Sequence, residues 1–225
     1  MCSRYSLYTQ QQTLEQYFKI SFDHLPFHPR YNIAPFQKIL CVRENASTPT
    51  AEYLTWGIKL NDWYRGVINA RSETVASKPL FSTAFRTKRC LIIADGFYEW
   101  QHRGKEKIPS YIKRKSDTPF AFAGISGSWN PNDTTDACVI LTVPANTSIQ
   151  PIHSRMPVIL NPTDYKSWLQ PDSRSIDTAT SLLKPLPASA LTIHRVSNIV
   201  NSISNDTPEC VQVHLPQEPF QHSLL

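Results

Sequence analysis

The sequence predicts an α+β fold: a single domain with a mixed, mostly antiparallel and partly closed, barrel-like β-sheet and short peripheral helices. Short β-favouring runs follow one another along the 225 residues without regular alternation with long helical patterns, which disfavours a doubly wound parallel sheet. Eighteen prolines against six glycines disfavour long helical solenoids, because proline breaks helices. A chain of this length, 40% hydrophobic, can bury a sizeable core.

The first predicted element is a helix that begins near Thr9. Thr9 and Gln12 have the spacing of a capping box, and Leu14, Tyr17 and Phe18 make one apolar stripe. After a proline-rich turn, runs rich in β-branched and aromatic residues predict strands. These predicted strands are Ile39–Arg43, Glu52–Gly57, Arg89–Ala94, Phe97–Gln101, Ser110–Arg114, Phe120–Ile125, Ala137–Val143, Met156–Leu160, Leu191–Val196 and Cys210–His214.

A second helix is predicted within the last third of the chain. Asn161 is a capping residue followed by Pro162 at the first helical position, and this pair leads into Tyr165–Leu169. No internal repeat or low-complexity tract divides the chain. We therefore predict one domain over residues 1–213 and a flexible tail over residues 214–225.

Net charge and the motifs present in the sequence indicate which classes of partner and cofactor to expect. The net charge of +5 suits a polyanionic partner, although many proteins with such a charge bind none. No apolar run reaches the roughly 18 residues of a membrane-spanning helix, and the amino terminus lacks the apolar run of a signal peptide. No glycine-rich phosphate-binding motif occurs. We therefore expect no membrane partner and no nucleotide cofactor, and we expect a monomer.

The cysteines predict reduced thiols. Five cysteines are widely spaced, with no C-x-x-C pair and no neighbouring histidine cluster, which disfavours a zinc site and a disulfide framework. Cys41, Cys90, Cys138 and Cys210 lie within or beside apolar predicted strands and are expected in the core. We expect no metal and no cofactor, and a location in the cytoplasm, associated with the nucleoid in a bacterium, or in the nucleus of a eukaryote.

Cys2 is the most informative candidate for chemistry. Removal of the initiator methionine before this small residue would leave a cysteine that carries the free α-amine of the chain. An α-amine has an ordinary pKa near 8, so a sizeable fraction is nucleophilic at neutral pH. The amine and the thiol can condense with one aldehyde carbon, first as a Schiff base and then as a thiazolidine ring. The alternative is that a cysteine stands in second position by chance.

Two polar segments interrupt the apolar pattern. Asn32 lies in the turn before a predicted strand. Asn69 and Arg71 belong to a polar cluster between apolar stretches, where arginine offers a planar fork for phosphate and asparagine an amide donor. Alternatively, Arg71 and Glu73 form a salt bridge within a loop.

Glu99 and His153 are the candidate acid–base groups. Glu99 lies among aromatic residues, a setting that raises the pKa of a carboxyl group. Alternatively, it faces solvent, because strand alternation places Phe97 and Glu99 on the face opposite Tyr98 and Trp100. His153 lies where a loop enters a strand, and an imidazole there can meet a substrate.

Six blocks in order resemble the SOS response-associated peptidase (SRAP) family. They are Cys2 behind the initiator Met, Arg-Tyr-Asn-Ile-Ala-Pro (30–35), Asn-Ala-Arg-Ser-Glu-Thr (69–74), Asp-Gly-Phe-Tyr-Glu-Trp (95–100), His-Ser-Arg-Met-Pro (153–157) and Val-Ser-Asn-Ile-Val-Asn (196–201). The resemblance runs from residue 2 to about residue 210. The sequence departs from the family at Ser3, where glycine is usual, and after Trp56-Gly57, where a downstream proline is absent.

The resemblance implies a single mixed α/β domain that shields abasic sites in single-stranded DNA. Cys2 would form a thiazolidine crosslink with the open-ring sugar aldehyde, with weak abasic-site lyase activity by β-elimination as a side reaction. Glu99 would shuttle protons, His153 would assist sugar opening, and Asn32 would orient the α-amine of Cys2.

The resemblance also implies a DNA-binding set: Arg4, Pro35, Trp63, Asn69, Arg71, Trp100 and Ser154. Asn69 and Arg71 would grip phosphates. Arg4 would attract the backbone and favour the Cys2 thiolate. Pro35, Trp63 and Trp100 would stack on or wedge between bases, with core packing as the alternative for Trp100.

Two other functions remain open from the sequence. A cysteine peptidase, including an autopeptidase, would use Cys2 as nucleophile and His153 as base, but it needs an oxyanion hole that the sequence does not identify. A non-catalytic single-strand-binding module would rely on charge and stacking alone, and Cys2 would then be dispensable.

Overall fold

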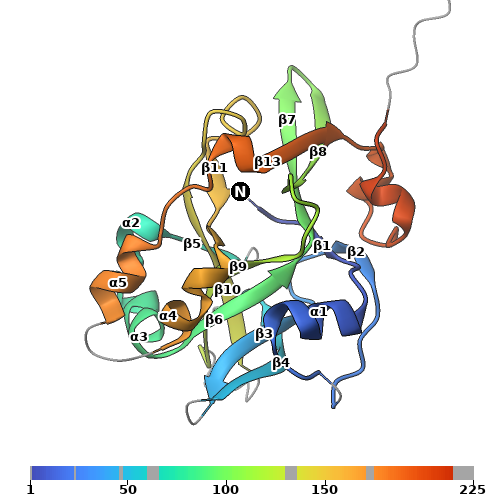
Figure 1. The fold of residues 1–225 in the computed structure, drawn as a ribbon. Coiled ribbons are helices and arrows are strands. Elements are labelled where there is room, and N and C mark those ends of the chain that lie inside the picture. The colour runs from blue at the N-terminus through green and yellow to red at the C-terminus, as the bar shows by residue number, and fades with distance from the viewer. Residues whose placement is uncertain are drawn as a thin grey trace, which may run out of the picture.

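The computed structural model describes residues 2–22, 24–45, 48–59, 66–129, 136–170 and 175–214. It confirms the predicted α+β class, with two sheets in the centre and short helices at the periphery (Figure 1). Within the described ranges, no helix is long and apolar enough to cross a membrane. His214 is the last described residue, and its N–H donates to the carbonyl oxygen of Arg195 at 2.9 Å; the rest of the predicted tail, 215–225, lies outside the described residues.

The larger sheet is partly closed. In spatial order its strands are β11 (Arg155–Pro157), β10 (Ala137–Pro144), β4 (Thr48–Trp56), β3 (Lys38–Asn45), β6 (Arg89–Ala94), β9 (Phe120–Gly127) and β12 (Ile159–Leu160), with β5 (Asn69–Arg71) beside β10. β10 runs parallel to β4 and β5 and antiparallel to β9. The sheet therefore curls back on itself without forming a complete barrel.

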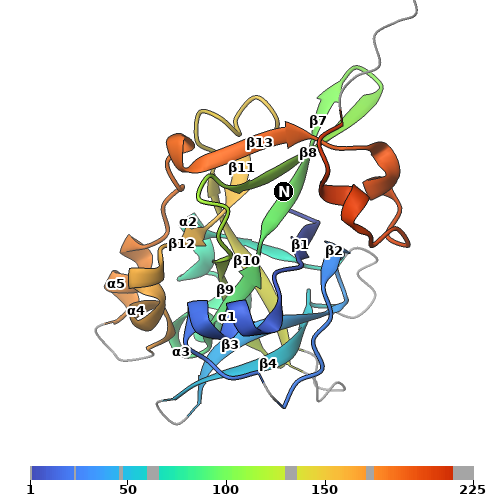
Figure 2. The same ribbon diagram turned by 45° about the vertical axis from the view of Figure 1, so that its right-hand side comes forward.

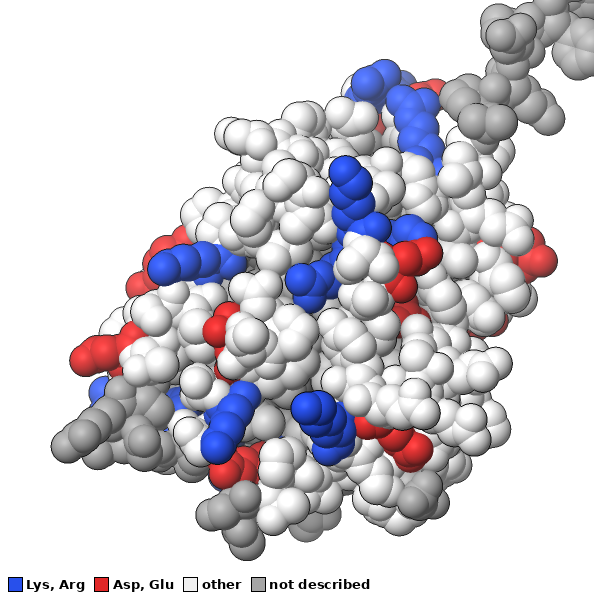
Figure 3. All heavy atoms as spheres, viewed as in Figure 1, with Lys and Arg blue, Asp and Glu red and all other residues white. Residues whose placement is uncertain are grey.

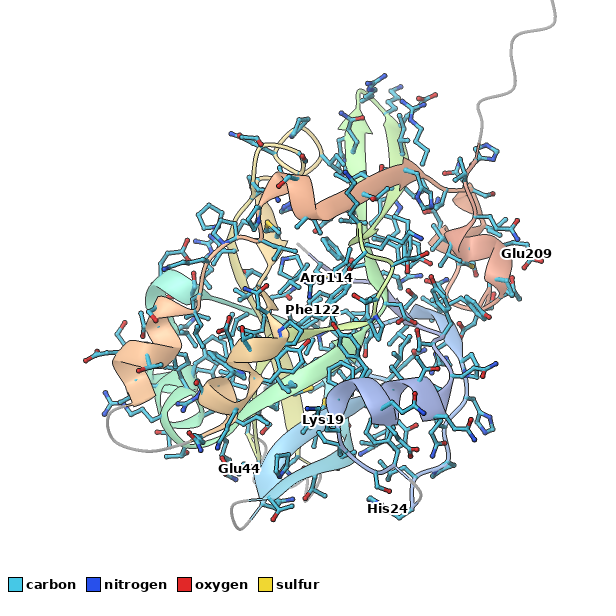
Figure 4. The ribbon with its side chains drawn as sticks, viewed as in Figure 1. Lys19, His24, Glu44, Arg114, Phe122 and Glu209 are labelled. Carbon is cyan, nitrogen blue, oxygen red and sulfur yellow. The ribbon has the colours of Figure 1, made fainter. Side chains whose placement is uncertain are left out.

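The smaller sheet is antiparallel and carries the amino-terminal strand. Its order is β13 (Leu191–Arg195), β8 (Glu106–Arg114), β7 (Gly96–Arg103), β1 (Tyr5–Leu7) and β2 (Arg30–Ile33). Only Asp95 separates β6 of the larger sheet from β7. The Phe122 ring from β9 packs edge-on against Tyr5 of β1 and Phe97 of β7, at centroid distances of 5.8 and 6.0 Å. This residue lies in the middle of the molecule (Figure 4) and joins the two sheets.

The helices lie around the sheets, as predicted. In Figure 2, α3, α4 and α5 gather on one side of the larger sheet, and α1 lies near β3 and β4. Their bounds are α1 (Gln11–Phe18), α2 (Ser72–Val75), α3 (Pro79–Thr87), α4 (Tyr165–Leu169) and α5 (Ser175–Ser181), and the 3-10 turns are η1 (Pro162–Asp164), η2 (Ala188–Ala190), η3 (Asn198–Asn201) and η4 (Pro208–Val211). The helix start predicted at Asn161 is confirmed, with η1 leading into α4.

The capping box predicted at the first helix is wrong. The helix begins after Gln10, and no side chain caps it. The Thr9 hydroxyl instead donates to Oδ1 of Asp95 at 2.7 Å, and the Thr9 N–H donates to Oδ2 of the same carboxylate. The buried Asp95 between the two sheets therefore holds Thr9 away from the helix.

Two predicted strands also differ from the structure. The segment Cys210–His214 is not a strand, because Pro208 opens the turn η4 and Cys210 N–H bonds locally to the Thr207 carbonyl oxygen. Met156–Leu160 divides into β11 and β12 at Val158. Val158 donates its N–H to Leu141 on β10 and accepts from Ala123 on β9, so the segment pairs with a different strand on each side.

The prediction for the later cysteines is confirmed. Cys41, Cys90, Cys138 and Cys210 are free thiols, each 0% exposed. Cys41 and Cys138 lie inside the larger sheet with their Sγ atoms 3.9 Å apart. Their surroundings are apolar, as expected for core residues.

Candidate active site

Cys2, near the start of the chain, is fully buried, with 0% of its surface exposed. Its Sγ is 3.8 Å from the carbonyl oxygen of Arg4, to which it donates. Burial, reinforced by the Glu99 carboxylate, raises the pKa of the thiol well above its ordinary value. The thiol is therefore protonated at neutral pH, and the expectation that Arg4 favours the thiolate stays a prediction.

Asn69 holds the backbone of Cys2. Its Nδ2 donates to the Cys2 carbonyl oxygen at 2.9 Å, and its place on β5 is set by the parallel register opposite Ile140 of β10. Its Oδ1 is buried and has no hydrogen-bond partner among the described residues. Asn69, expected from the sequence at a phosphate, instead uses its amide nitrogen on the nucleophile's own backbone.

Glu99 is a buried acid on β7. The residue is 3% exposed, because alternation puts it on the face of Phe97, which packs into the larger core, whereas Tyr98 belongs to a second cluster. Burial raises the pKa of the Glu99 carboxyl group, and positive charge on His153 opposes this rise. The predicted raised pKa is confirmed, and the solvent-facing alternative is wrong.

His153 lies half-buried in the turn before β11. The backbone N–H of Arg155 donates to its Nδ1 at 3.0 Å. Nδ1 also lies 3.2 Å from the carbonyl oxygen of Arg155, so both backbone groups of Arg155 hold the imidazole ring in place. Positive charge on this imidazole acts on the Glu99 carboxyl group.

Asn32 joins the site through Arg4. Its Oδ1 accepts from Nη1 of Arg4 at 2.7 Å, and its Nδ2 donates to the carbonyl oxygens of Val200, Ser202 and Asn205. Arg4 Nη1 also donates to the Val200 carbonyl oxygen at 2.8 Å. The fully buried Asn32 therefore fastens Arg4 to the segment around η3.

Trp100 borders the same segment. Its Nε1 donates to Oδ1 of Asn201 at 2.8 Å, and the Arg4 guanidinium lies 5.8 Å from its ring centroid. Trp100 is partly buried against the second cluster, so the core-packing alternative holds for part of its surface. Of the other predicted DNA-binding residues, Pro35 is half-buried, Ser154 is exposed beside His153, and Trp63 lies outside the described residues.

Two arginines flank Thr142 on β10. Arg71 is exposed on β5 in register with Thr142, and Nε of Arg155 donates to the Thr142 hydroxyl at 3.2 Å. The alternative from the sequence was a salt bridge between Arg71 and Glu73. In the structure Glu73 instead pairs with Arg155, with N–O distances of 2.7 and 2.9 Å. These bonds lower the pKa of the Glu73 carboxyl group to about 2.

Sequence reasoning missed Arg155, although it stands within the quoted block 153–157. Its position two residues after His153 was the available signal. In the part of the chain that the structure describes, no group of three or more His, Cys, Asp or Glu side chains is arranged to hold a metal ion. The chemistry available at this site comes from the thiol of Cys2, the carboxyl group of Glu99, the imidazole of His153 and the amides of Asn32 and Asn69.

Comparison with known proteins places these residues in a family context. The sequence profile of the family described as "SOS response associated peptidase (SRAP)" matches residues 1–203. The chain is 38% identical to the abasic site processing protein YoqW of Bacillus subtilis (95% of this chain, 100% of the relative) and 28% identical to YedK of Escherichia coli, also named an abasic site processing protein (94% and 99%).

A solved structure agrees with this assignment. A protein from Bacteroides thetaiotaomicron superposes with a TM-score of 0.80 at 25% identity, over 95% of this chain and 100% of that one. A similarity that covers both chains almost entirely supports the same fold throughout. The chain belongs to the SOS response associated peptidase (SRAP) family.

Proposed function

We propose that this chain processes abasic sites in single-stranded DNA by capturing the sugar aldehyde covalently on Cys2. The relatives YoqW and YedK are named abasic site processing proteins. The observation that carries the proposal is the arrangement at the amino terminus, where Asn69 holds the Cys2 backbone and the buried Glu99 carboxylate acts on the Cys2 thiol. Removal of the initiator methionine would complete the 1,2-aminothiol.

The proposed reaction has a defined order. The α-amine of Cys2 attacks the aldehyde carbon, and the resulting carbinolamine loses one water to give a Schiff base. The thiol then adds to the same carbon, and its proton passes to the imine nitrogen, which closes the thiazolidine ring. The raised pKa of the buried thiol supports this order, because the protonated thiol is a weaker first nucleophile than a neutral amine.

Glu99 and His153 would divide the proton transfers. A carboxyl group with a raised pKa can take the thiol proton and release it to nitrogen at near-neutral pH. His153, whose Nδ1 is held by the backbone of Arg155, would protonate the sugar ring oxygen as the closed hemiacetal opens. The same Schiff base would permit weak β-elimination at the 3′ phosphate.

The DNA backbone would follow the cationic side of the site. Arg71 is exposed, and Arg155 beside it is held by Thr142 and Glu73. On the face seen in Figure 1, Figure 3 shows scattered Lys and Arg side chains, with a group at the upper end where the tip of the β7–β8 hairpin lies. Such cations bind phosphates without reading sequence. Ser154, Trp100, Pro35 and Trp63 complete the proposed DNA-binding set, in which Asn69 acts through the backbone of Cys2.

The peptidase alternative is less well supported. A cysteine peptidase attacks with a thiolate, whereas burial raises the pKa of the Cys2 thiol. We therefore favour capture of an aldehyde by a monomer without cofactor, wherever single-stranded DNA is exposed in the cytoplasm or nucleus.

Intact-mass measurement after incubation with an abasic single-stranded oligonucleotide tests the proposal. The expected product is the chain without Met1 joined to the oligonucleotide with loss of one water, stable to heat without a reducing agent. Cys2→Ser retains the amine and should form only a Schiff base that needs reduction to survive. Active protein that fully retains Met1, or a heat-stable adduct of the serine variant, would contradict the mechanism.

A further inference from the structure

Phe36 combines an unfavourable backbone conformation with an exposed ring. Its φ is 67°, a region that bulky residues avoid, and it is 37% exposed, one of few large hydrophobic residues at the surface of the described ranges. Glycine or asparagine would form the same turn with less strain. The turn itself therefore does not account for an aromatic side chain here.

Two glycines, Gly57 and Gly66, pack closely against the Phe36 ring and are called the glycine shelf below. A Cβ atom at Gly66 would lie 2.5 Å from Cζ of Phe36, and one at Gly57 would lie 3.1 Å from Cε1. Both glycines have positive φ, 112° at Gly57 and 51° at Gly66. The backbone thus supports one side of the ring at a separation that only glycine permits, and the ring still reaches solvent.

A cation accompanies the ring. Nζ of Lys59 lies 5.2 Å from the ring centroid of Phe36, within the range of a cation–π interaction, and Lys59 is exposed. An exposed aromatic surface beside a flexible ammonium group matches the two parts of a nucleotide, a flat base and an anionic phosphate.

The platform of Phe36 and Lys59 lies at the same end of the small sheet as Cys2. β1 and β2 are antiparallel with Tyr5 opposite Ile33, so the chain before Tyr5, towards Cys2, and the chain after Ile33, towards Phe36, leave the sheet at one end. On the other side, the shelf residue Gly57 adjoins Ile68. Ile68 precedes Asn69, which holds the Cys2 carbonyl oxygen.

We propose that Phe36 and Lys59 form a stacking platform for the nucleobase next to the abasic position. A strand that has lost a base leaves its neighbour without a stacking partner on one side, and an exposed aromatic ring can replace that partner. Lys59 would pair with the adjacent phosphate. This inference rests on the proposed function, since it names a subsite beside the captured sugar.

Reversible binding to a tetrahydrofuran abasic analogue tests the platform without covalent capture, because this analogue has no aldehyde. Three oligonucleotides suffice: one with bases on both sides of the analogue, one with the 5′ neighbour also replaced by the analogue, and one with the 3′ neighbour replaced. Wild-type protein should lose roughly five-fold or more in affinity when the stacked neighbour is removed. Phe36→Ala should bind the first oligonucleotide about as weakly as the wild type binds the one that lacks the stacked neighbour. Its affinity should not fall further when that neighbour is removed.

Further variants separate stacking from folding. Phe36→Trp should retain the loss of affinity that follows removal of the neighbouring base. Phe36→Gly suits the positive φ, so this variant should stay folded in a thermal melt but should no longer respond to removal of that base. Val213→Ala removes another exposed apolar side chain and should leave the response unchanged. Lys59→Met should weaken all three oligonucleotides alike and reduce the salt dependence.

The inference is overturned if Phe36→Ala or Phe36→Gly, shown to be folded, still distinguishes the oligonucleotides as the wild type does, or if the wild type binds all three equally. Failure of the proposed function has a different signature. In that case the aldehyde-bearing strand gives no adduct with Cys2, whereas the response of the analogue series to Phe36 is unaffected.

Discussion

Asn69 Nδ2 donates a hydrogen bond of 2.9 Å to the carbonyl oxygen of Cys2. A residue on β5, paired in parallel with β10, therefore positions the first residue of the proposed mature chain. This contact matters because the amino end of a chain has freedom to move unless a tertiary contact holds it.

Replacing Asn69 with leucine keeps the volume and removes the donor. We expect Asn69→Leu to slow adduct formation with abasic single-stranded DNA by about five-fold, since a net hydrogen bond of about 1 kcal/mol is lost from the positioned nucleophile. Asn69→Asp, which can only accept, should be slowed similarly. Single-turnover gel assays at saturating DNA measure this rate, and a wild-type rate in both folded variants would rule out positioning by Asn69.

Glu99→Gln should alter the pH dependence of stability. The pKa of Glu99 is raised in the folded chain, so the stability associated with the protonated carboxyl group is present below the unfolded pKa of about 4.5 and is lost as pH rises through the folded value. Glutamine has no such loss. The Tm of Glu99→Gln relative to wild type should therefore increase from pH 4 towards neutrality, whereas a constant difference in thermal melts would contradict a buried, titrating carboxyl group.

Arg71→Ala should weaken binding to all single strands alike. The loss of one phosphate contact should lower the slope of log affinity against log salt by about 0.7, with no preference for abasic over intact strands. Arg86→Ala removes an exposed arginine from α3 and serves as the charge-matched control. Anisotropy titrations across a salt series give both slopes, and equal slopes for the two variants would assign Arg71 no phosphate contact.

Asn32→Ala should act mainly on stability. The substitution leaves the carbonyl oxygens of Ser202 and Asn205 without the Asn32 donor and removes the acceptor of Arg4. Each buried group that loses its partner costs about 1–3 kcal/mol, so we expect a loss of roughly 3 kcal/mol in the free energy of unfolding by urea. Ser202→Ala keeps the backbone acceptor and should change little; equal effects of the two substitutions would show that Asn32 does not fasten this segment.

Local features of the sequence predicted the elements whose pattern is self-contained. β6 and β9 are buried along their whole length and apolar except at Arg89 and Ser126, and the helix at Asn161 carries its own start signal. The burial of Glu99 follows from strand alternation beside Phe97. The sequence pattern gave a wrong prediction where a residue far along the chain binds a side chain expected to act locally. Thr9 was expected to cap the first helix, but its hydroxyl donates to the Asp95 carboxylate.

Apolar periodicity and residue chemistry are local properties, and from them the fold class, most strands and the candidates Cys2, Glu99 and His153 could be predicted. The hydrogen-bond partners of the polar side chains, in contrast, depend on how distant segments pack. Asn69 is assigned to Cys2, Asn32 to Arg4 and Glu73 to Arg155. An amide or carboxylate can bond to any complementary group, and strand register and burial select among those groups only after segments far apart in the chain have packed together.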